Sequence, residues 1–204
     1  MTEFKNKLTE GQHHLLSNDE TLSIYINKIG DCDYPLKQDY FISLVGSIIS
    51  QQLSTKATST IFNRLVTLVG DEITPQRLKL FEVNDLRKVG LSRNKAEYIL
   101  KLATEYDSEK FNKLKNLEDQ EVIHFLTSFN GIGEWTSQMF LIFSLGRLDV
   151  LPINDVGVRN GIKKIYSLEN ISNRKLIDIA SKWQPYRSIG SWYSWQVVDN
   201  KNMF

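Results

Sequence analysis

The sequence predicts an all-α protein. No stretch alternates apolar and polar residues with the period of two that a half-buried β-strand shows. The two Asn-Gly pairs, Asn130-Gly131 and Asn160-Gly161, lie beside helical patterns and do not join two strand-like runs. Ser, Thr or Asn repeatedly precedes a helical pattern, and Gly often follows it, as at helix ends. These observations favour one helix after another.

In the first half of the chain, capping signals delimit most of the expected helices. Asn18 is a candidate N-cap and Gly30 a stop, while Ser54 and Gly70 bracket another run in the same way. Pro75 follows Thr74, at the first helical position that proline favours. The expected helices are 19–29, 40–53, 55–69, one that starts at 75, a short one between 84 and 90, and 93–106.

The second half continues the same pattern. Its expected helices are 118–127, 134–145, 155–166, 172–183 and a last one from about 186. No linker rich in Pro, Gly or Ser divides the chain. If the helices form two lobes, the chain therefore passes from one lobe to the other without a flexible linker.

The composition is that of a globular protein. The chain has 204 residues, of which 41% are hydrophobic and 11% aromatic, enough to bury a substantial core. It has no run of about 18 apolar residues, so no membrane span is expected. The opening "MTEFKNKLTEGQHH" lacks the apolar segment of a secretory signal. We expect a cytoplasmic protein.

The sulfur and imidazole side chains argue against a metal centre. Cys32 is the single cysteine, so it excludes an internal disulfide, a four-cysteine iron–sulfur cluster and a cysteine-based structural zinc site. His13, His14 and His124 do not have the spacing of metal ligands and are interpreted as ordinary surface or half-buried residues. We therefore expect neither a metal nor a cofactor.

The charge distribution alone does not predict a polyanionic partner. The net charge is +1. From Asp155 to the end, eight Lys and Arg residues stand against four acidic residues, which gives +4, and the preceding 154 residues carry −3. This asymmetry is modest, and by itself it favours a solvated face over a nucleic-acid-binding face.

The stretch "FNGIGEWTSQMF" (129–140) places two glycines directly before a helical run. Gly131 and Gly133 can adopt φ > 0 and leave the first N–H groups of the next helix exposed, and the helix dipole then favours an anion there. A helix–hairpin–helix turn holds one DNA phosphate in this way and needs no net basic charge. The alternative is a tight connection between two helices. Residues 85–99 show a weaker form of the same pattern, in which a helix end is followed by a short turn with glycine and a new helix.

Asp155 is the candidate catalytic residue of the sequence. It follows a Pro-containing turn in "DVLPINDVGVRNG" (149–161), near the start of a helix. An Asp at this place most often caps the helix. If Asn154 provides the cap instead, the Asp155 carboxylate is available for chemistry, 20 residues after Trp135. Both possibilities remain open from the sequence.

Four blocks, in the expected order, resemble the helix–hairpin–helix DNA glycosylase superfamily, and in particular the 3-methyladenine DNA glycosylase II family. They are "SLVGSIISQQLSTKAT" (43–58), "VGLSRNKAEYILKLA" (89–103), "FNGIGEWTSQMFLIFSLGRLDVLPINDVGVRNGI" (129–162) and "WQPYRSIGSWYSW" (183–195). The hairpin followed at this distance by Pro-x-x-Asp is the most specific of these features.

The resemblance implies a fold of two helical lobes with an active-site cleft between them. Lobe A would span about 38–130, and lobe B about 1–37 with 131–204. The helix–hairpin–helix would span about 118–145. The resemblance also implies a monomer that acts on double-stranded DNA with damaged bases, at the nucleoid if the source is bacterial.

The resemblance further assigns Asp155 as the catalytic carboxylate, which fits the chemistry of an oxocarbenium-like sugar. Trp135, Met139 and Trp195 would form the pocket for a flipped, cationic purine such as 3-methyladenine or 7-methylguanine. Better-known members carry an aromatic residue at the position of Met139. Trp192 and Tyr193 are interpreted as core residues.

Trp135 also indicates the reaction type. In the lyase-active branches of the superfamily, this position holds a lysine that forms a Schiff base with the sugar. The chain is therefore expected to be monofunctional.

The remaining DNA contacts implied by the resemblance come from two turns. Gly131, Gly133 and Thr136 belong to the hairpin, and Gln51 and Gln52 belong to the turn in "SQQLS" (50–54). The second turn would enter the gap left by the flipped nucleotide, with Gln52 the better candidate for the inserted side chain. The alternative is an ordinary helix–helix turn.

Two other functional classes stay open. One is a non-catalytic DNA-binding protein that uses the hairpin only as a phosphate clamp, and the position of Asp155 weighs against it. The other is an all-α interaction scaffold unrelated to DNA, and the four matching blocks weigh against that. Release of free base from methylated DNA separates the three classes, because the clamp binds without release and the scaffold does not bind.

Overall fold

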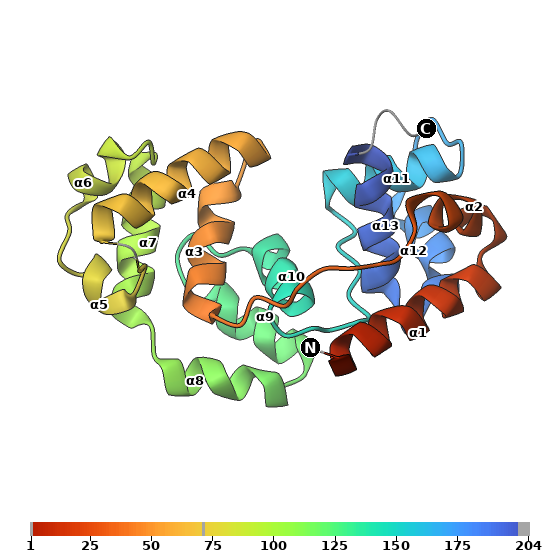
Figure 1. The fold of residues 1–204 in the computed structure, drawn as a ribbon, viewed down its shortest axis with the longest axis horizontal. Helices are drawn as coiled ribbons and strands as arrows, with labels where there is room; N and C mark the ends of the chain where they lie inside the picture. Colours follow the sequence, from red (N-terminus) through yellow and green to blue (C-terminus); the bar gives the residue numbers. More distant parts are fainter. Residues whose placement is uncertain (1, 71, 200–204) are drawn as a thin grey trace. The chain divides into compact units, whose positions relative to one another are not determined.

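The computed structural model describes residues 2–70 and 72–199 (Figure 1). Within these ranges every regular element is a helix and no strand occurs, so the predicted all-α class is confirmed. The chain forms two compact units. Unit 1 combines the residues up to Pro35 with those from Gly146 onward, and unit 2 spans Leu36–Leu145.

Unit 2 is built around one helix that is apolar on several sides. The helices of this unit are α3 (Tyr40–Ser50), α4 (Thr55–Val69), α5 (Pro75–Leu78), α6 (Val83–Lys88), α7 (Arg93–Glu105), α8 (Ser108–Lys113), η1 (Leu114–Asn116), α9 (Asp119–Thr127) and α10 (Glu134–Phe143). Helix α3 packs against α4, α7 and α10. Contact on three sides explains its broad apolar face, because Leu44, Val45, Ile48 and Ile49 are all fully buried.

An aromatic cluster fixes the path into the hairpin. The ring of Tyr106, at the end of α7, stacks on Phe111 of α8 with 4.4 Å between centroids. Phe111 then meets the rings of Phe125 in α9 and Phe129 in the hairpin, at 5.3 and 5.5 Å. Such ring pairs add to the stability that burial alone provides. The cluster therefore anchors α9 and the start of the hairpin to α7 and α8.

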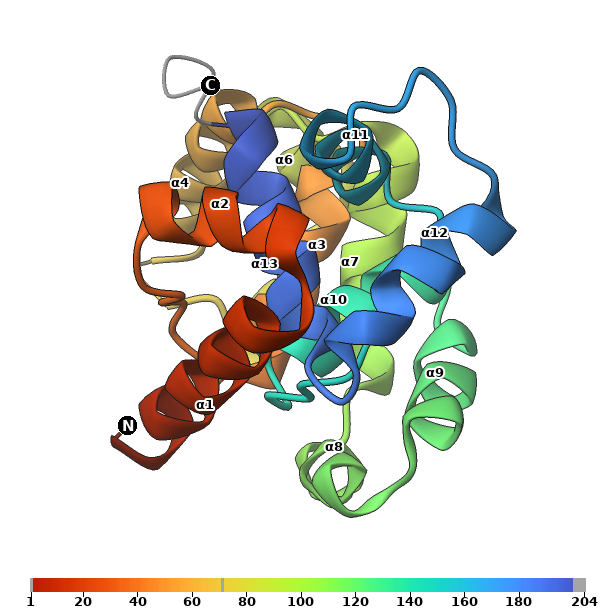
Figure 2. The same cartoon turned by 90° about the vertical axis from the view of Figure 1, so that its right-hand side faces the viewer.

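Unit 1 joins helices from the two ends of the chain. They are α1 (Thr2–Asn18), α2 (Glu20–Ile29), α11 (Val156–Ile165), α12 (Asn173–Ala180), η2 (Ser181–Trp183) and α13 (Arg187–Asp199). Figure 2 shows α1 and α2, in red, beside the blue α13, against which both pack. Helices α11 and α13 share the most extensive contact in this unit.

A buried carboxylate ties the N-terminal helices to the rest of unit 1. Asp19 is 1% exposed and caps α2 by accepting the N–H of Leu22. Its Oδ2 also accepts from the indole N–H of Trp183, at 2.9 Å, and from the Tyr166 hydroxyl. A buried charge needs such partners to offset its desolvation. Asp19, rather than the expected Asn18, is thus the cap of α2.

Helix α1 is absent from the helices predicted by sequence. Its sequence is largely polar, and only Leu8 and Leu15 are fully buried apolar residues. Gly11 in its middle lowers intrinsic helix propensity. A Cβ there would overlap the side chain of Ile189 in α13, so the glycine allows the two helices to approach closely. Tertiary packing, rather than local pattern, stabilises this helix.

The predicted lobe boundary near residue 130 is displaced to Leu145. The hairpin and α10 belong to unit 2, because α10 packs against α9 and α3. A hydrogen bond between the buried hydroxyls of Ser43 in α3 and Ser144, with 2.7 Å between oxygens, supports this placement.

Several predicted helices differ at their ends. Helix α3 stops at Ser50 instead of residue 53, and the expected helix 172–183 consists of α12 followed by the short η2. The helix α8 was not predicted.

Lys201, which contributes to the basic excess of the C-terminal part, lies outside the described residues.

Candidate active site

Asp155 is the N-cap of α11. It is 8% exposed, and its Oδ1 accepts the backbone N–H of Val158 at 2.7 Å. Of the two possibilities that the sequence left open, Asp155 therefore provides the cap and Asn154 does not. An extended backbone at Asp155 (φ −71°, ψ 124°) gives the side chain the usual capping geometry. The helix N-terminus favours the negative charge and holds the carboxylate in one orientation.

Trp195 provides a second donor to the same oxygen. Its indole Nε1–H lies 2.9 Å from Asp155 Oδ1. Gly157 makes this approach possible, since a Cβ at that residue would lie 2.7 Å from Trp195 Cδ1 and 3.1 Å from Asp155 Oδ1. The carboxylate is thus held between a helix N-terminus and an indole ring, both within unit 1.

Two arginines hold the segment that leads to Asp155. Arg187, at the start of α13, donates from Nε and Nη2 to the two carboxylate oxygens of Asp149, at 2.7 and 2.9 Å. Arg159 of α11 donates to the carbonyl of Ile153 at 3.0 Å. A paired arginine–carboxylate contact is more specific in geometry than a single hydrogen bond. Contacts from α11 and α13 therefore fix the segment that leads to Asp155.

The hairpin in unit 2 lies between α9 and α10. Gly131 has φ = +83°, which glycine adopts readily, whereas Gly133 has φ = −97° and needs no such freedom. A Cβ at Gly131 would also overlap the ring of Tyr98 in α7. Gly133 is the N-cap of α10 and makes no side-chain capping hydrogen bond. A Cβ at Gly133 would meet nothing within 4 Å, so its absence is not required by packing inside the protein.

The turn between α3 and α4 is joined to the hairpin. The Gln51 amide Nε2 donates to the carbonyl of Gly131 at 2.8 Å and lies 3.3 Å from the hydroxyl of Thr136. Thr136 is buried, at 2% exposed. Gln52 is solvent-exposed and has φ = +58°, which is uncommon for a residue other than glycine. The structure thus brings together Gln51, Gly131 and Thr136, and leaves Gln52 exposed beside them.

The comparisons identify the family. Residues 45–185 match the model of the HhH-GPD superfamily base excision DNA repair protein. The chain belongs to the HhH-GPD superfamily. DNA-3-methyladenine glycosylase 1 of Schizosaccharomyces pombe is 30% identical over 203 residues, which cover 95% of this chain and 89% of that relative.

Solved structures of the same kind share the fold. A DNA-3-methyladenine glycosidase from Bacillus halodurans is 38% identical, covers 92% of this chain and 88% of its own, and has a TM-score of 0.78. The S. pombe 3-methyladenine DNA glycosylase in complex with abasic DNA is 28% identical and covers 92% of this chain and 95% of its own, with a TM-score of 0.84.

The candidate base-pocket residues of the HhH-GPD chain and the aromatic residues near Trp195 differ in solvent exposure. Trp135, near the start of α10, is 36% exposed, whereas Met139 is 9% exposed. Tyr193 is fully buried and donates its hydroxyl to the carbonyl of Gly30 at 2.9 Å, which confirms it as a core residue. Trp192 is half-buried and meets the Tyr193 ring edge-on.

Two features of the HhH-GPD site were missed from the sequence. Gln51 was interpreted only as a possible DNA contact, and its link to the hairpin spans 80 positions, which no local pattern reveals. Gly157, two residues after Asp155, was the second feature missed. Its spacing of four from Gly161 is a usable signal, because small residues at this spacing on one helix allow a second helix to approach.

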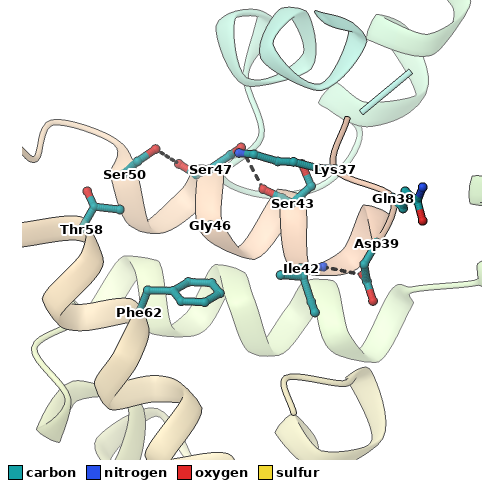
Figure 3. Close-up of a pocket in the computed structure, with 10 residues that line it drawn as sticks. All are labelled: Lys37, Gln38, Asp39, Ile42, Ser43, Gly46, Ser47, Ser50, Thr58 and Phe62. Atoms are coloured by element: carbon teal, nitrogen blue, oxygen red, sulfur yellow. Dashed lines mark hydrogen bonds between the residues drawn. The ribbon is translucent and has the colours of Figure 1, made fainter. Parts of the chain in front are cut away.

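Unit 2 also contains a pocket of about 510 Å³ beside α3 (Figure 3). Its lining includes the hydroxyl groups of Ser43 and Ser47, the ring of Phe62 and the side chain of Lys37, which extends along α3 in the figure. Burial lowers the pKa of the Lys37 ammonium. Neither Trp135 nor Met139 lines this pocket.

Two structural features are absent from residues 2–70 and 72–199. No helix there is long and apolar enough to cross a membrane. The same residues contain no cluster of three or more His, Cys, Asp or Glu side chains suited to bind a metal ion.

Proposed function

We propose that the chain is a monofunctional DNA glycosylase that removes alkylated purines, of the 3-methyladenine and 7-methylguanine type, from double-stranded DNA, and that it acts as a monomer. The main observation that supports this proposal is the Asp155 carboxylate, which the N–H groups of Val158 and Trp195 hold at the start of α11. Membership of the HhH-GPD superfamily supports the repair function. The names of the similar glycosylases support the class of base.

Asp155 is the proposed catalytic residue. Cleavage of an N-glycosidic bond develops positive charge on the sugar, and a fixed carboxylate stabilises that charge without having to reorganise. The carboxylate can also orient the attacking water. Two donors on one oxygen and a close-packed Gly157 restrict its movement. The protein therefore supplies an oriented negative charge, and the cationic base supplies the good leaving group.

The proposed base-contacting side chains are aromatic or polarisable. Trp135 and Met139 serve in unit 2, and Trp195 serves in unit 1. An aromatic face attracts a cationic purine by roughly 0.5–2 kcal/mol. Methionine contributes a flexible, polarisable surface instead of a rigid ring. We therefore expect Met139 to widen the range of bases accepted relative to an aromatic residue.

The hairpin is the proposed phosphate contact. Gly133 has ordinary backbone angles and open space where a Cβ would stand, so neither conformation nor internal packing requires glycine there. Close approach of an external group to the N-terminus of α10 does account for it. Gln51 and Thr136 support this contact by holding the hairpin against the α3–α4 turn.

Replacement of Gly133 by Ala should weaken binding of all DNA sequences about tenfold, because the added methyl group blocks a charge-assisted contact to phosphate. A fluorescence anisotropy titration with damaged and undamaged duplexes measures this. The melting temperature should stay unchanged, since the methyl group meets no protein atom. A loss confined to lesion-containing DNA would contradict a phosphate contact, which carries no sequence information.

The reaction itself is tested with duplexes that carry one defined alkylated purine. Free base should appear by chromatography, the strand should break only after alkali, and borohydride should trap no protein–DNA adduct. Trp135 offers no amine for a Schiff base, and Lys163 lies about 12 Å along α11 from Asp155, at 1.5 Å per residue. Binding without base release would favour the non-catalytic clamp. An adduct lost on mutation of one lysine would overturn the monofunctional assignment.

A further inference from the structure

The α3–α4 turn holds an exposed residue in a disfavoured conformation. Helix α3 ends at Ser50 and α4 begins at Thr55, and Gln52 between them has φ = +58°. A side chain other than glycine, Asn or Asp rarely adopts this region unless its surroundings impose it. Some interaction must therefore hold the turn.

The side chain of Lys95 is in the position to do so. Lys95 lies in the first turn of α7, and its ammonium Nζ donates to the carbonyls of Ile49 at 2.8 Å and of Gln51 at 2.7 Å. These two carbonyls lie on either side of Ser50, where α3 ends. A cation that binds the last carbonyls of a helix satisfies groups without intrahelical partners and complements the helix dipole.

Apart from the Gln51 side chain, which bonds Gly131 and Thr136 of the hairpin, the other hydrogen bonds of the turn are local. The N–H of Leu53 donates to the carbonyl of Ser50 at 3.0 Å, and the Ser54 hydroxyl caps α4 by accepting the N–H of Ala57 at 3.3 Å. Lys95 differs from the Gln51 contacts because it comes from another helix, 44 positions from Gln51, and bonds the backbone of the turn. It therefore ties the exit of α3 to the body of unit 2.

We infer that Lys95 is a positioning residue that holds the turn in the conformation that presents Gln52 to the DNA. The inference rests on the proposed function and on the role that the family resemblance implies for Gln52, which is to fill the gap left by the flipped base. Lys95 acts on the DNA through Gln52 and not by direct contact, because two of the three donors of its ammonium are directed to backbone carbonyls.

The test is a double-mutant cycle with Lys95→Met and Gln52→Ala. Excision from a duplex with a single alkylated purine is followed under single-turnover conditions. Lys95→Met should slow excision about tenfold or more in the wild-type background, and less than threefold when Gln52 is already Ala, because coupled residues do not act additively. Lys110→Met is the control, since Lys110 is exposed and pairs with Asp107, the N-cap of α8.

A second measurement distinguishes positioning from direct phosphate contact. The slope of log binding constant against log salt should be the same for Lys95→Met and the wild type. Loss of a phosphate contact would reduce that slope by about 0.9. A reduced slope, an additive cycle or an unchanged excision rate would each overturn the inference.

The fold and the proposed function are controlled separately. Circular dichroism checks that each variant is folded, and if Lys95→Met is not, the cycle is run with Lys95→Gln, whose amide still donates to a carbonyl. If the wild-type protein releases no base, the proposed function fails. If the wild type is active and the cycle is additive, only the role of Lys95 fails.

Discussion

Replacement of Asp155 by Asn should reduce base excision by about 10²–10³-fold or more, because a neutral amide cannot stabilise the positive charge that develops on the sugar. The fold should remain intact. Asn caps helices as well as Asp does, and its Oδ1 can still accept from Val158 and Trp195. Single-turnover release of a defined alkylated purine measures the loss.

Two controls make the Asp155 result interpretable. The affinity of the variant for a duplex with an abasic-site analogue should stay close to that of the wild type, since the DNA contacts proposed for unit 2 are untouched. The melting temperature should change little. Turnover within a few-fold of the wild-type rate would remove Asp155 from the mechanism.

Replacement of Gly161 by Ala should destabilise unit 1 by about 1–3 kcal/mol, the usual cost of overpacking. The new Cβ would overlap the backbone of Ser194, which cannot move without displacing all of α13. The melting temperature should fall by about 5 °C. Excision should also fall at temperatures where the protein is folded, because α13 carries Trp195.

Gly46→Ala is the matched control for Gly161→Ala. Gly46 also lies within a helix, but its added Cβ would meet only the Phe62 ring, at 3.9 Å. Alanine there should be neutral or slightly stabilising, since it favours helix more than glycine does. Similar melting temperatures for the two variants would show that the packing of α11 against α13 does not require glycine at residue 161.

The helical class was predictable because most of its signals are local. Ser54 caps α4 as the sequence suggests, and Ser92 caps α7 in the same way, with the side chain accepting an N–H three residues on. The alternation of caps and apolar stripes requires no knowledge of distant contacts. Helix α1 escaped prediction because its stability comes from docking and not from its own sequence.

The candidate site was predictable only in part, for the same physical reason. Asp155 was identified, but its function as cap depends on one backbone angle that sequence does not set. The indole bond from Trp195 joins residues 40 positions apart, and the Gln51 bridge joins residues 80 positions apart. Gly133 was noted for a positive φ that it does not have. What singles out Gly133 is instead the open space where a Cβ would stand, and that space depends on the three-dimensional structure.

The division of unit 1 into two chain segments has a consequence for synthesis on the ribosome. Unit 2 is one continuous segment and can fold as soon as it emerges. The helices α1 and α2 emerge earlier, yet the partners of Asp19 are Tyr166 and Trp183, which follow it by 147 and 164 residues. Contacts so distant in sequence form slowly. The proposed catalytic carboxylate therefore belongs to the unit that is completed last, so a nascent chain can form its hairpin before it can form the proposed active site.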